Sequence, residues 1–433
     1  MRILVDQSGY DLLNIGDVAM LQACVTRLRA QWPDAEIMVV AADRARLAAY
    51  CPGTIAIGRT FADLRLLHAV PRKARLALEQ AWKVAGPYLS RSARARQTPA
   101  RTPRTAVQAV RVADLVVASG GGYLNDTFWW HASGVLSLLS LAQRLGKSTA
   151  MFGQGIGPMS RRLLRAQARA VFPRLAVLSL REEGIGRGLA TSLGAEQGAL
   201  RLAGDDALEH DIARRGSPWP GAAGPVEGEN VAASQVLGLN LRVSGYAGVN
   251  QATATAVGRV VQDAASGLGA DLIGLPVSRY ATGADAGALR ALASAADAQA
   301  SIAVEDIVTP EALAAAAARC RVVITGSYHA AVFSLAAGVP AVCLTNSRYY
   351  DAKFGGLAAL FPGACWIVPL GSPDSARRLR VAVQDAWQLS AAERAAGAAT
   401  ARRLCDAGRQ AYAQFRVAVE EQEIHRGSRV MVR

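Results

Sequence analysis

The chain is poor in lysine, in aromatic residues and in long apolar runs. Only four of its 48 basic residues are lysine, and aromatic residues make up 6% of the 433 positions. No apolar run approaches the ~20 residues that a membrane-spanning helix needs. Near the N-terminus, Asp6 interrupts the apolar run, so no signal peptide is predicted. We therefore expect a cytoplasmic protein.

Cysteine pairs that could bind a metal are also missing. The six cysteines lie far apart, and none forms the C-x-x-C pair typical of zinc sites. This spacing argues against disulfides and against a zinc site. We predict no metal site and no cofactor, because the segment GGGYLND does not fit the G-x-G-x-x-G pattern of dinucleotide-binding sites.

Basic residues are in excess, but the excess is local. The formal net charge is +14, which by itself favours an acidic partner. Residues 64–113 hold eleven Arg and Lys residues against the single acidic residue Glu79, and the rest of the chain is only mildly basic. No nucleic-acid recognition motif is present, so we predict no nucleic-acid partner.

Part of this basic segment has the pattern of an amphipathic helix. Residues 72–89 read RKARLALEQAWKVAGPYL, which mixes apolar residues with four cations. A basic amphipathic helix can lie on an anionic membrane surface. Residues 70–104 are therefore a candidate for peripheral contact with the inner face of a membrane. The alternative is a packed helix followed by an Arg-rich loop.

Apolar strands alternate with helical patterns along most of the chain. The first strands are predicted at residues 2–6 and 35–43, and this alternation indicates a parallel sheet with helices on both faces. Gly and Pro interrupt the pattern at 216–230, and it resumes at 236–242. The sequence thus predicts an α/β protein with two Rossmann-like domains that face each other across a cleft, a GT-B-like architecture.

The same pattern gives expected domain boundaries. An N-terminal Rossmann-like domain is predicted at residues 1–215, with the basic insertion at 64–113. A linker at 216–233 precedes a C-terminal Rossmann-like domain at 234–375. A helical segment at 376–433 closes the chain, and its last helix is expected to cross back to the first domain.

Polar and glycine-rich loops follow several predicted strands at their carboxyl ends, where open α/β sheets bind ligands. Asp17 is placed to be the N-cap of a helix that runs to Gln31. Glycines let backbone N–H groups approach an anion, although each loop alone could be only a tight turn. The loop residues are Asn14, Gly16, Asp17, Gly120, Gly121, Gly122, Asn125, Asp126, Gly153, Gln154, Gly155, Gly157 and Arg181.

One histidine lies in a further turn of this kind. Residues 319–344, RCRVVITGSYHAAVFSLAAGVPAVCL, combine a strand, a turn, a helix of small residues and a second strand. The turn contains Ser327, Tyr328 and His329. At a helix start the macrodipole disfavours a charged imidazolium. His329 alone could cap the helix or fill the core, but its position at a strand's carboxyl end favours a functional role.

The loops NIGDVAM, ASGGGYLND, GQGIGP, LREEG, GDDALE, NLRVSGY and GSYHAAVFSLAAGVPAV carry a resemblance. In this order, over residues 1 to 362, the chain resembles the polysaccharide pyruvyl transferase family. The resemblance implies a GT-B-like fold and the transfer of a pyruvyl group from phosphoenolpyruvate to a sugar as a ketal. It implies phosphoenolpyruvate as donor and a sugar or lipid-linked glycan as acceptor.

The resemblance also implies site residues. The family has an Arg-Leu-His triplet at the strand-to-helix turn, and here the triplet is Ser327-Tyr328-His329. The histidine carries over and the triplet arginine does not, while Arg181 matches an arginine of the family's N-terminal domain. We predict that Arg348 or Lys353, from the loop expected after the next strand, replaces the absent arginine.

Ketal formation explains which residue types are needed. A histidine can deliver a proton to the enol carbon, and Arg side chains with backbone N–H groups can hold phosphate and carboxylate. His329 is the predicted acid, and Asp126 or Asp17 could accept a hydroxyl proton. The predicted donor-binding residues are Gly16, Asp17, Gly120, Gly121, Gly122, Gln154, Arg181, Ser327, Tyr328, Arg348 and Lys353. The predicted acceptor-binding residues are Asn125, Arg242, Tyr349 and Tyr350.

Two other functions stay open. A nucleotide-sugar-dependent glycosyltransferase of the same fold often holds the ribose with a Glu on the helix after this turn, and residues 328–338 contain no carboxylate. A non-catalytic carbohydrate-binding relative would explain the missing arginine. It would not explain the retained His329.

Overall fold

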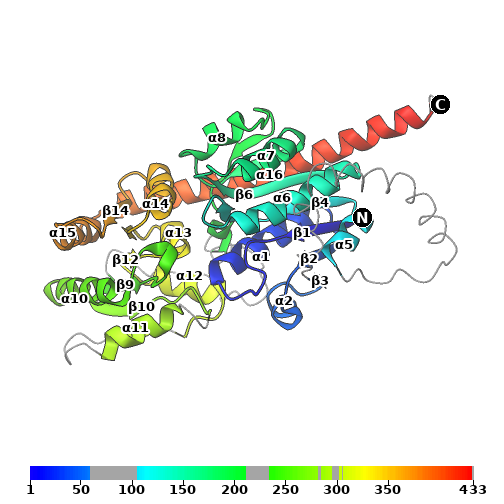
Figure 1. The fold of residues 1–433 in the computed structure, drawn as a ribbon. Coiled ribbons are helices and arrows are strands. Elements are labelled where there is room, and N and C mark those ends of the chain that lie inside the picture. Colours follow the sequence, from blue (N-terminus) through cyan, green and yellow to red (C-terminus); the bar gives the residue numbers. More distant parts are fainter. Residues whose placement is uncertain (59–104, 211–233, 281–283, 295–301, 305, 432–433) are drawn as a thin grey trace.

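Two parallel β-sheets, each covered by helices, form the framework of the protein (Figure 1). The structure is a computed structural model, and it describes residues 1–58, 105–210, 234–280, 284–294, 302–304 and 306–431. We refer to residues 1–210 as the N-terminal half and to residues 234–387 as the C-terminal half. The predicted linker 216–233 and the candidate membrane segment 70–104 lie outside the described residues.

The N-terminal half contains the larger sheet, with strand order β3-β2-β1-β4-β6-β7-β8 and β5 paired to β6. The strands are almost wholly buried and rich in Val, Leu and Ile, as expected when helices cover both faces of a parallel sheet. Their bounds are β1 Arg2–Asp6, β2 Glu36–Val40, β3 Ile55–Ile57, β4 Leu115–Ala118, β5 Gly121–Leu124, β6 Ser148–Ile156, β7 Val177–Leu180 and β8 Leu200–Leu202.

The helices of this half follow the strands in the expected alternation. They are α1 Ile15–Gln31, α2 Arg44–Tyr50, α5 Ala106–Val112, α6 Trp129–Arg144, α7 Arg162–Val171 and α8 Gly186–Ser192, with the short 3₁₀ turns η1 Phe172–Arg174 and η2 Asp206–Leu208.

The C-terminal half repeats the design with a second parallel sheet, in the order β11-β10-β9-β12-β13-β14. Its strands are β9 Val236–Asn240, β10 Asp271–Gly274, β11 Ile302–Val304, β12 Val322–Thr325, β13 Ala341–Thr345 and β14 Cys365–Pro369. Its helices are η4 Gly245–Ala247, α10 Gln251–Leu268, α11 Asp285–Ser294, α12 Pro310–Ala318, α13 Tyr328–Ala336, α14 Arg348–Leu360 and α15 Ser375–Trp387.

The last helix, α16 (Ala391–Met431), spans both halves, as the sequence led us to expect (Figure 1). It packs on α13 in the C-terminal half and on α1, β6, β7 and β8 in the N-terminal half. Its Tyr412 stacks on Phe152 of β6 with a centroid separation of 3.7 Å. The single helical pattern predicted after residue 376 is in fact two helices, α15 and α16. None of the described helices has an apolar stretch that could span a bilayer.

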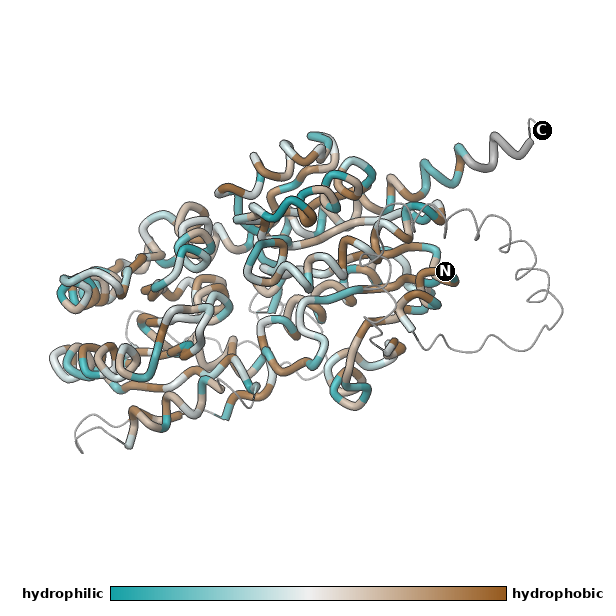
Figure 2. Tube along the Cα trace, viewed as in Figure 1, coloured by the Kyte–Doolittle hydropathy of each residue, from teal (hydrophilic) through white to brown (hydrophobic). Residues whose placement is uncertain are grey.

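The two halves meet at the carboxyl ends of their strands. The loop after β1 pairs with the loop after β10: Ile15 N donates to Val277 O at 3.0 Å, and Arg279 N donates to Leu13 O at 2.8 Å. One apolar cluster contains Met20 of α1 together with Phe333 and Phe354 of the C-terminal half. Hydrophobic residues run along the strands of both sheets (Figure 2). The core is thus continuous across the junction.

Candidate active site

His329 is the second residue of α13 and lies directly against the loop after β1. A Cβ atom on Gly16 would lie 2.0 Å from both Cγ and Nδ1 of His329, so only glycine leaves room for the imidazole. His329 is 7% exposed, and its Nε2 lies 3.9 Å from Oδ2 of Asp205. Among the described residues Nε2 has no hydrogen-bond partner. The histidine is therefore held tightly, and its Nε2 is buried without a hydrogen-bond partner among the described residues.

The surroundings of His329 keep the imidazole neutral. Burial lowers its pKa well below the usual value, and the nearby cations Lys353, Arg181 and Arg242 lower it further. The predicted role of His329 as the acid therefore requires a bound ligand that raises this pKa.

Arg181 lies at the end of β7 and is fully buried beneath α13. Its Nε is 2.8 Å from Oε2 of Glu182, and its Nη1 donates to Oδ2 of Asp205 at 3.2 Å. The guanidinium carbon lies 4.1 Å from the ring centroid of Tyr328. Nη2 has no hydrogen-bond partner in the described part of the chain. It lies where a side chain on Gly122 would be, at 2.5 Å from such a Cβ.

Lys353 reaches the same place from the C-terminal half. It belongs to helix α14, which begins at Arg348, and not to the loop that the sequence predicted. Its Nζ lies 4.8 Å from the ring centroid of Tyr328 and 4.9 Å from that of Tyr349. Burial first, and repulsion from Arg181 second, lower the pKa of Lys353 to about 7. Arg348 is exposed at the start of the helix, so of the two predicted cations only Lys353 is in the site.

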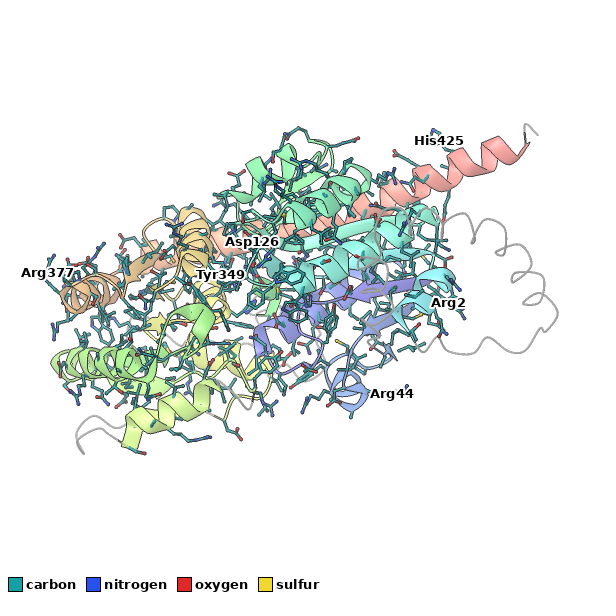
Figure 3. All side chains as sticks on the ribbon, viewed as in Figure 1. Arg2, Arg44, Asp126, Tyr349, Arg377 and His425 are labelled. Atoms are coloured by element: carbon teal, nitrogen blue, oxygen red, sulfur yellow. The ribbon has the colours of Figure 1, made fainter. Side chains whose placement is uncertain are left out.

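Lys353 and Arg181 border a small open recess. A Cβ on Gly122 would lie 3.1 Å from Nζ of Lys353, so a side chain at this position would crowd both Lys353 and Arg181. The predicted residues Asn125 and Tyr349 also line the recess. Tyr349, labelled in Figure 3, donates from its hydroxyl to Gly122 O at 3.0 Å and thereby connects the two halves.

Sequence reasoning gave no role to two carboxylates of the site: it noted Glu182 only as a polar residue after a strand, and it did not single out Asp205. Glu182 is buried, and its Oε2 accepts a hydrogen bond from the Tyr328 hydroxyl at 3.0 Å. Burial is the main reason that the pKa of Glu182 is raised. Asp205 bridges Arg181 and His329. The motifs LREEG and GDDALE contain both residues, but only the packing of the two halves shows that their side chains point at α13.

Asp17 faces the cations but does not cap the helix, which corrects the N-cap prediction. Asn14 is the N-cap of α1, and its side chain accepts from Gly16 N at 3.0 Å and from Asp17 N at 3.3 Å. The Asp17 carboxylate accepts from the Ser8 hydroxyl at 2.7 Å. Burial raises the pKa of Asp17, although Ser8, Lys353 and Arg242 act in the opposite direction.

Asp126 is held by another loop, and this contradicts its predicted role as the base. Its carboxylate accepts from the backbone N and the hydroxyl of Ser160, both at 2.7 Å, and from Arg161 N at 3.1 Å. Burial raises the pKa of Asp126, but these hydrogen bonds outweigh it and the pKa is lowered. The side chain therefore fixes the start of α7 and is poorly suited to accept a proton.

The predicted glycine-rich loops are partly strands. Gly121 and Gly122 belong to β5, and Gln154 lies inside β6. The Gln154 amide donates to Ser119 O at 2.7 Å and to Phe152 O at 2.8 Å, and the residue is fully buried. Gln154 thus fixes the backbone beside Gly120 and is not placed to contact a donor.

The remaining predicted residues lie around the site in supporting positions. Asn125 donates to Gly122 O at 2.7 Å and shapes the loop before α6. Ser327 is buried, and its N–H donates to the Thr325 hydroxyl at 2.8 Å. Tyr350 stacks on Phe354 with a centroid separation of 5.6 Å.

Arg242 is buried and ion-paired within its own half. Its Nε lies 3.0 Å from Oδ1 of Asp285, and its Nη1 donates to the Tyr246 hydroxyl at 3.1 Å. Its charge nevertheless reaches His329 and Asp17, because it contributes to the pKa shift of each. Within the described ranges, no group of three or more His, Cys, Asp and Glu side chains is arranged to hold a metal ion.

Gly16 provides a direct test of this geometry. We expect Gly16→Ala to lower turnover by ~10²-fold or more, because its methyl group must displace the imidazole of His329. Overpacking should also cost about 1–3 kcal/mol of stability. Phosphate release from phosphoenolpyruvate with a sugar acceptor measures the first effect, and thermal unfolding measures the second. Gly188→Ala, where an added Cβ meets open space, is the control. Wild-type turnover in Gly16→Ala would contradict the close packing of Gly16 against His329.

Comparison with solved structures identifies the fold. The chain is similar to a putative UDP-N-acetylglucosamine 2-epimerase from Listeria monocytogenes (TM-score 0.55, 10% identity), covering 93% of this chain and 94% of that one. It is also similar to UGT89C1 of Arabidopsis thaliana complexed with UDP (TM-score 0.55, 11% identity), covering 97% and 99%. The glycotransferase of kitacinnamycin has a TM-score of 0.52 at 12% identity, with 98% of each chain covered. These likenesses confirm the predicted GT-B-like fold.

Sequence comparison is more specific. A comparison with curated proteins gave no match. The family model for polysaccharide pyruvyl transferase matches residues 14–348, which include both Gly16 and His329. Because this match covers most of the chain and its residues converge on one site, the protein belongs to the polysaccharide pyruvyl transferase family, a family of transferases.

Proposed function

We propose that the protein transfers the pyruvyl group of phosphoenolpyruvate to two hydroxyls of a sugar or glycan, forming a ketal. The observation that carries this proposal is the convergence of two cations, one from each half, beside a neutral histidine with an unpartnered Nε2. Arg181 and Lys353 suit a small ligand with several negative charges. Phosphoenolpyruvate carries a phosphate and a carboxylate on three carbons.

Lys353 takes the place of the arginine that the family triplet has and this chain lacks. Its Nζ lies over Tyr328, the middle residue of the triplet, at 4.8 Å from the ring centroid. Arg181 lies over the same ring at 4.1 Å. The two cations thus share one aromatic neighbour, and a donor phosphate or carboxylate between them would neutralise both.

Donor binding would also prepare the acid. In the protein without a ligand, burial and three cations lower the pKa of His329. The negative charges of the donor offset those cations, so the pKa of the imidazole rises and Nε2 can take up a proton. The imidazole of His329 would thus become protonated, and able to act as an acid, only when the donor is bound.

The reaction balances with the residues present. His329 gives its proton to the terminal enol carbon, and the C2 carbon becomes oxocarbenium-like. One sugar hydroxyl adds to C2, the bond from C2 to the phosphate oxygen breaks, and the second hydroxyl closes the ketal. Of the two hydroxyl protons, one returns to the protein and one leaves with phosphate. Asp17 suits the first of these protons better than Asp126, because its pKa is raised and it faces the cations.

A ligand screen by thermal unfolding tests the donor. We expect saturating phosphoenolpyruvate to raise the melting temperature by several degrees, because a ligand that binds only the folded state stabilises it by mass action. UDP-, GDP- and CMP-sugars are the alternative donors in the screen and should give no comparable rise. A rise with a nucleotide sugar and none with phosphoenolpyruvate would instead favour a glycosyltransferase.

A further inference from the structure

Exposed aromatic side chains are few in the described part of the chain, and two of them are neighbours at the start of α6. Among the described residues, the large exposed aromatic side chains are Trp129 (41%), Trp130 (42%) and Tyr246 (37%). Trp129 and Trp130 are the first two residues of α6. Leaving two consecutive indoles in water forgoes the stabilisation that their burial would bring. A role in the core therefore does not explain them.

Aromatic contacts connect these residues to the proposed donor site. Phe128, which directly precedes Trp129, lies 5.6 Å from the ring of Tyr246 and 5.6 Å from the ring of Tyr349. Tyr349 lines the recess beside Lys353. Phe128 thus connects Trp129, the next residue in the chain, with Tyr246 and with the recess residue Tyr349 of the other half.

Both indoles are held in place although they are exposed. The Arg161 guanidinium carbon lies 5.0 Å from the ring centroid of Trp129. Trp130 packs edge-on against His131, with a centroid separation of 5.7 Å, and His131 stacks on Tyr10 at 4.8 Å. A rigid exposed ring loses little conformational entropy when it binds a ligand.

From these observations we infer that Trp129 and Trp130 provide two neighbouring stacking surfaces, together called the platform, for sugar rings of the acceptor. Indole faces suit the apolar C–H faces of a pyranose, and the guanidinium of Arg161 supplies N–H donors for its hydroxyls. This inference rests on the proposed function, because it takes the acceptor to be a glycan. It assigns acceptor binding to residues that are separate from the donor cations.

Saturation-transfer NMR tests the platform with methyl β-D-galactopyranoside and the methyl β-glycoside of N-acetyl-D-mannosamine as probes. We expect transfer to the ring C–H protons of at least one probe in the wild type, and ~10-fold weaker affinity in the double variant Trp129→Ala/Trp130→Ala. The double variant with Phe at both positions should keep part of the affinity. Leu163→Ala, an exposed apolar residue of α7, is the control and should bind like the wild type.

The same variants are also tested with phosphoenolpyruvate by thermal unfolding. If phosphoenolpyruvate raises the melting temperature of the variants as much as that of the wild type, the variants are folded and only their affinity for the sugar is reduced. A wild type that responds to phosphoenolpyruvate but gives no sugar transfer, or equal transfer in all variants, would overturn the platform and leave the donor proposal intact. A missing donor shift would count against the proposed function instead. If the wild type sediments as a dimer and the Ala variant as a monomer, the pair is a self-association surface, and this result would also overturn the inference.

Discussion

Replacing His329 with alanine should lower the turnover number by ~10²–10⁴ while changing donor affinity much less. The reason is that the imidazole has no hydrogen-bond partner at Nε2 among the described residues, and its proposed work is the transfer of a proton to the enol carbon. Arg181 and Lys353, which carry the proposed donor affinity, stay in place. Steady-state kinetics of phosphate release, with phosphoenolpyruvate affinity measured separately, distinguish the two effects.

Two further variants sharpen this test. His329→Gln keeps a polar side chain in the space beside Gly16 but cannot act as an acid near neutral pH, so it should be as slow as the alanine variant. His425→Ala, on the exposed part of α16 labelled in Figure 3, should behave like the wild type. Equal losses of binding and turnover in His329→Ala would assign the histidine a structural role.

Replacing Lys353 with methionine should weaken phosphoenolpyruvate binding roughly 10- to 100-fold at pH 7, because a charge-assisted contact to the anion is lost. The wild type should also bind more weakly as the pH rises above 7. The pKa of Lys353 is about 7 in the protein without ligand, so above that pH the amine is neutral and must take up a proton when the anion binds. Affinity should then fall by up to ~10-fold per pH unit.

Calorimetry between pH 7 and 9 measures the affinity for phosphoenolpyruvate. A His329→Gln background separates the proton that Lys353 takes up from any that the imidazole takes up. Lys353→Arg keeps its charge throughout this range and should bind with little pH dependence. Arg348→Met removes an exposed cation five positions earlier on the same helix and should not change affinity. If Lys353→Arg shows the same pH profile as the wild type, or Arg348→Met loses as much affinity as Lys353→Met, then Lys353 is not the donor cation.

The sequence was sufficient for the architecture because the central strands are mostly apolar runs, as expected in sheets that helices cover on both faces. The segments RILVD and VVIT correspond to β1 and β12, and both are central in their sheets. The carboxyl ends of these strands indicated where polar residues would converge. His329 was named on that basis, Arg181 also from the family resemblance, and Lys353 as one of two candidates with Arg348. The charges of Arg181 and Lys353 both act on His329, and the roles of the three residues stay predictions.

The sequence did not predict which hydrogen-bond partner a side chain has when several polar neighbours are available. Asp126 and Asp17 both follow strands, and nothing in the sequence shows that Ser160 binds the first while the second faces the cations. Asn14, and not Asp17, caps the free N–H groups of α1, because Asn14 comes directly before the helix. The position of Glu182 and Asp205 in the site could not be predicted without knowing how the two halves pack.

The apolar cluster that runs through both halves limits how this protein can be recombined with its relatives. Its two sheets look like exchangeable modules, but Met20 and Leu208 complete an interior that Phe333 and Phe354 also fill. α16 packs on strands of the first sheet and on α13 of the C-terminal half. A chimera that joins the first sheet of one family member to the second sheet of another would therefore need α1, η2, α13, α14 and α16 from a single parent. Acceptor preference is more safely exchanged at Trp129 and Trp130 alone, because neither belongs to that cluster, whereas their neighbour Phe128 packs against it.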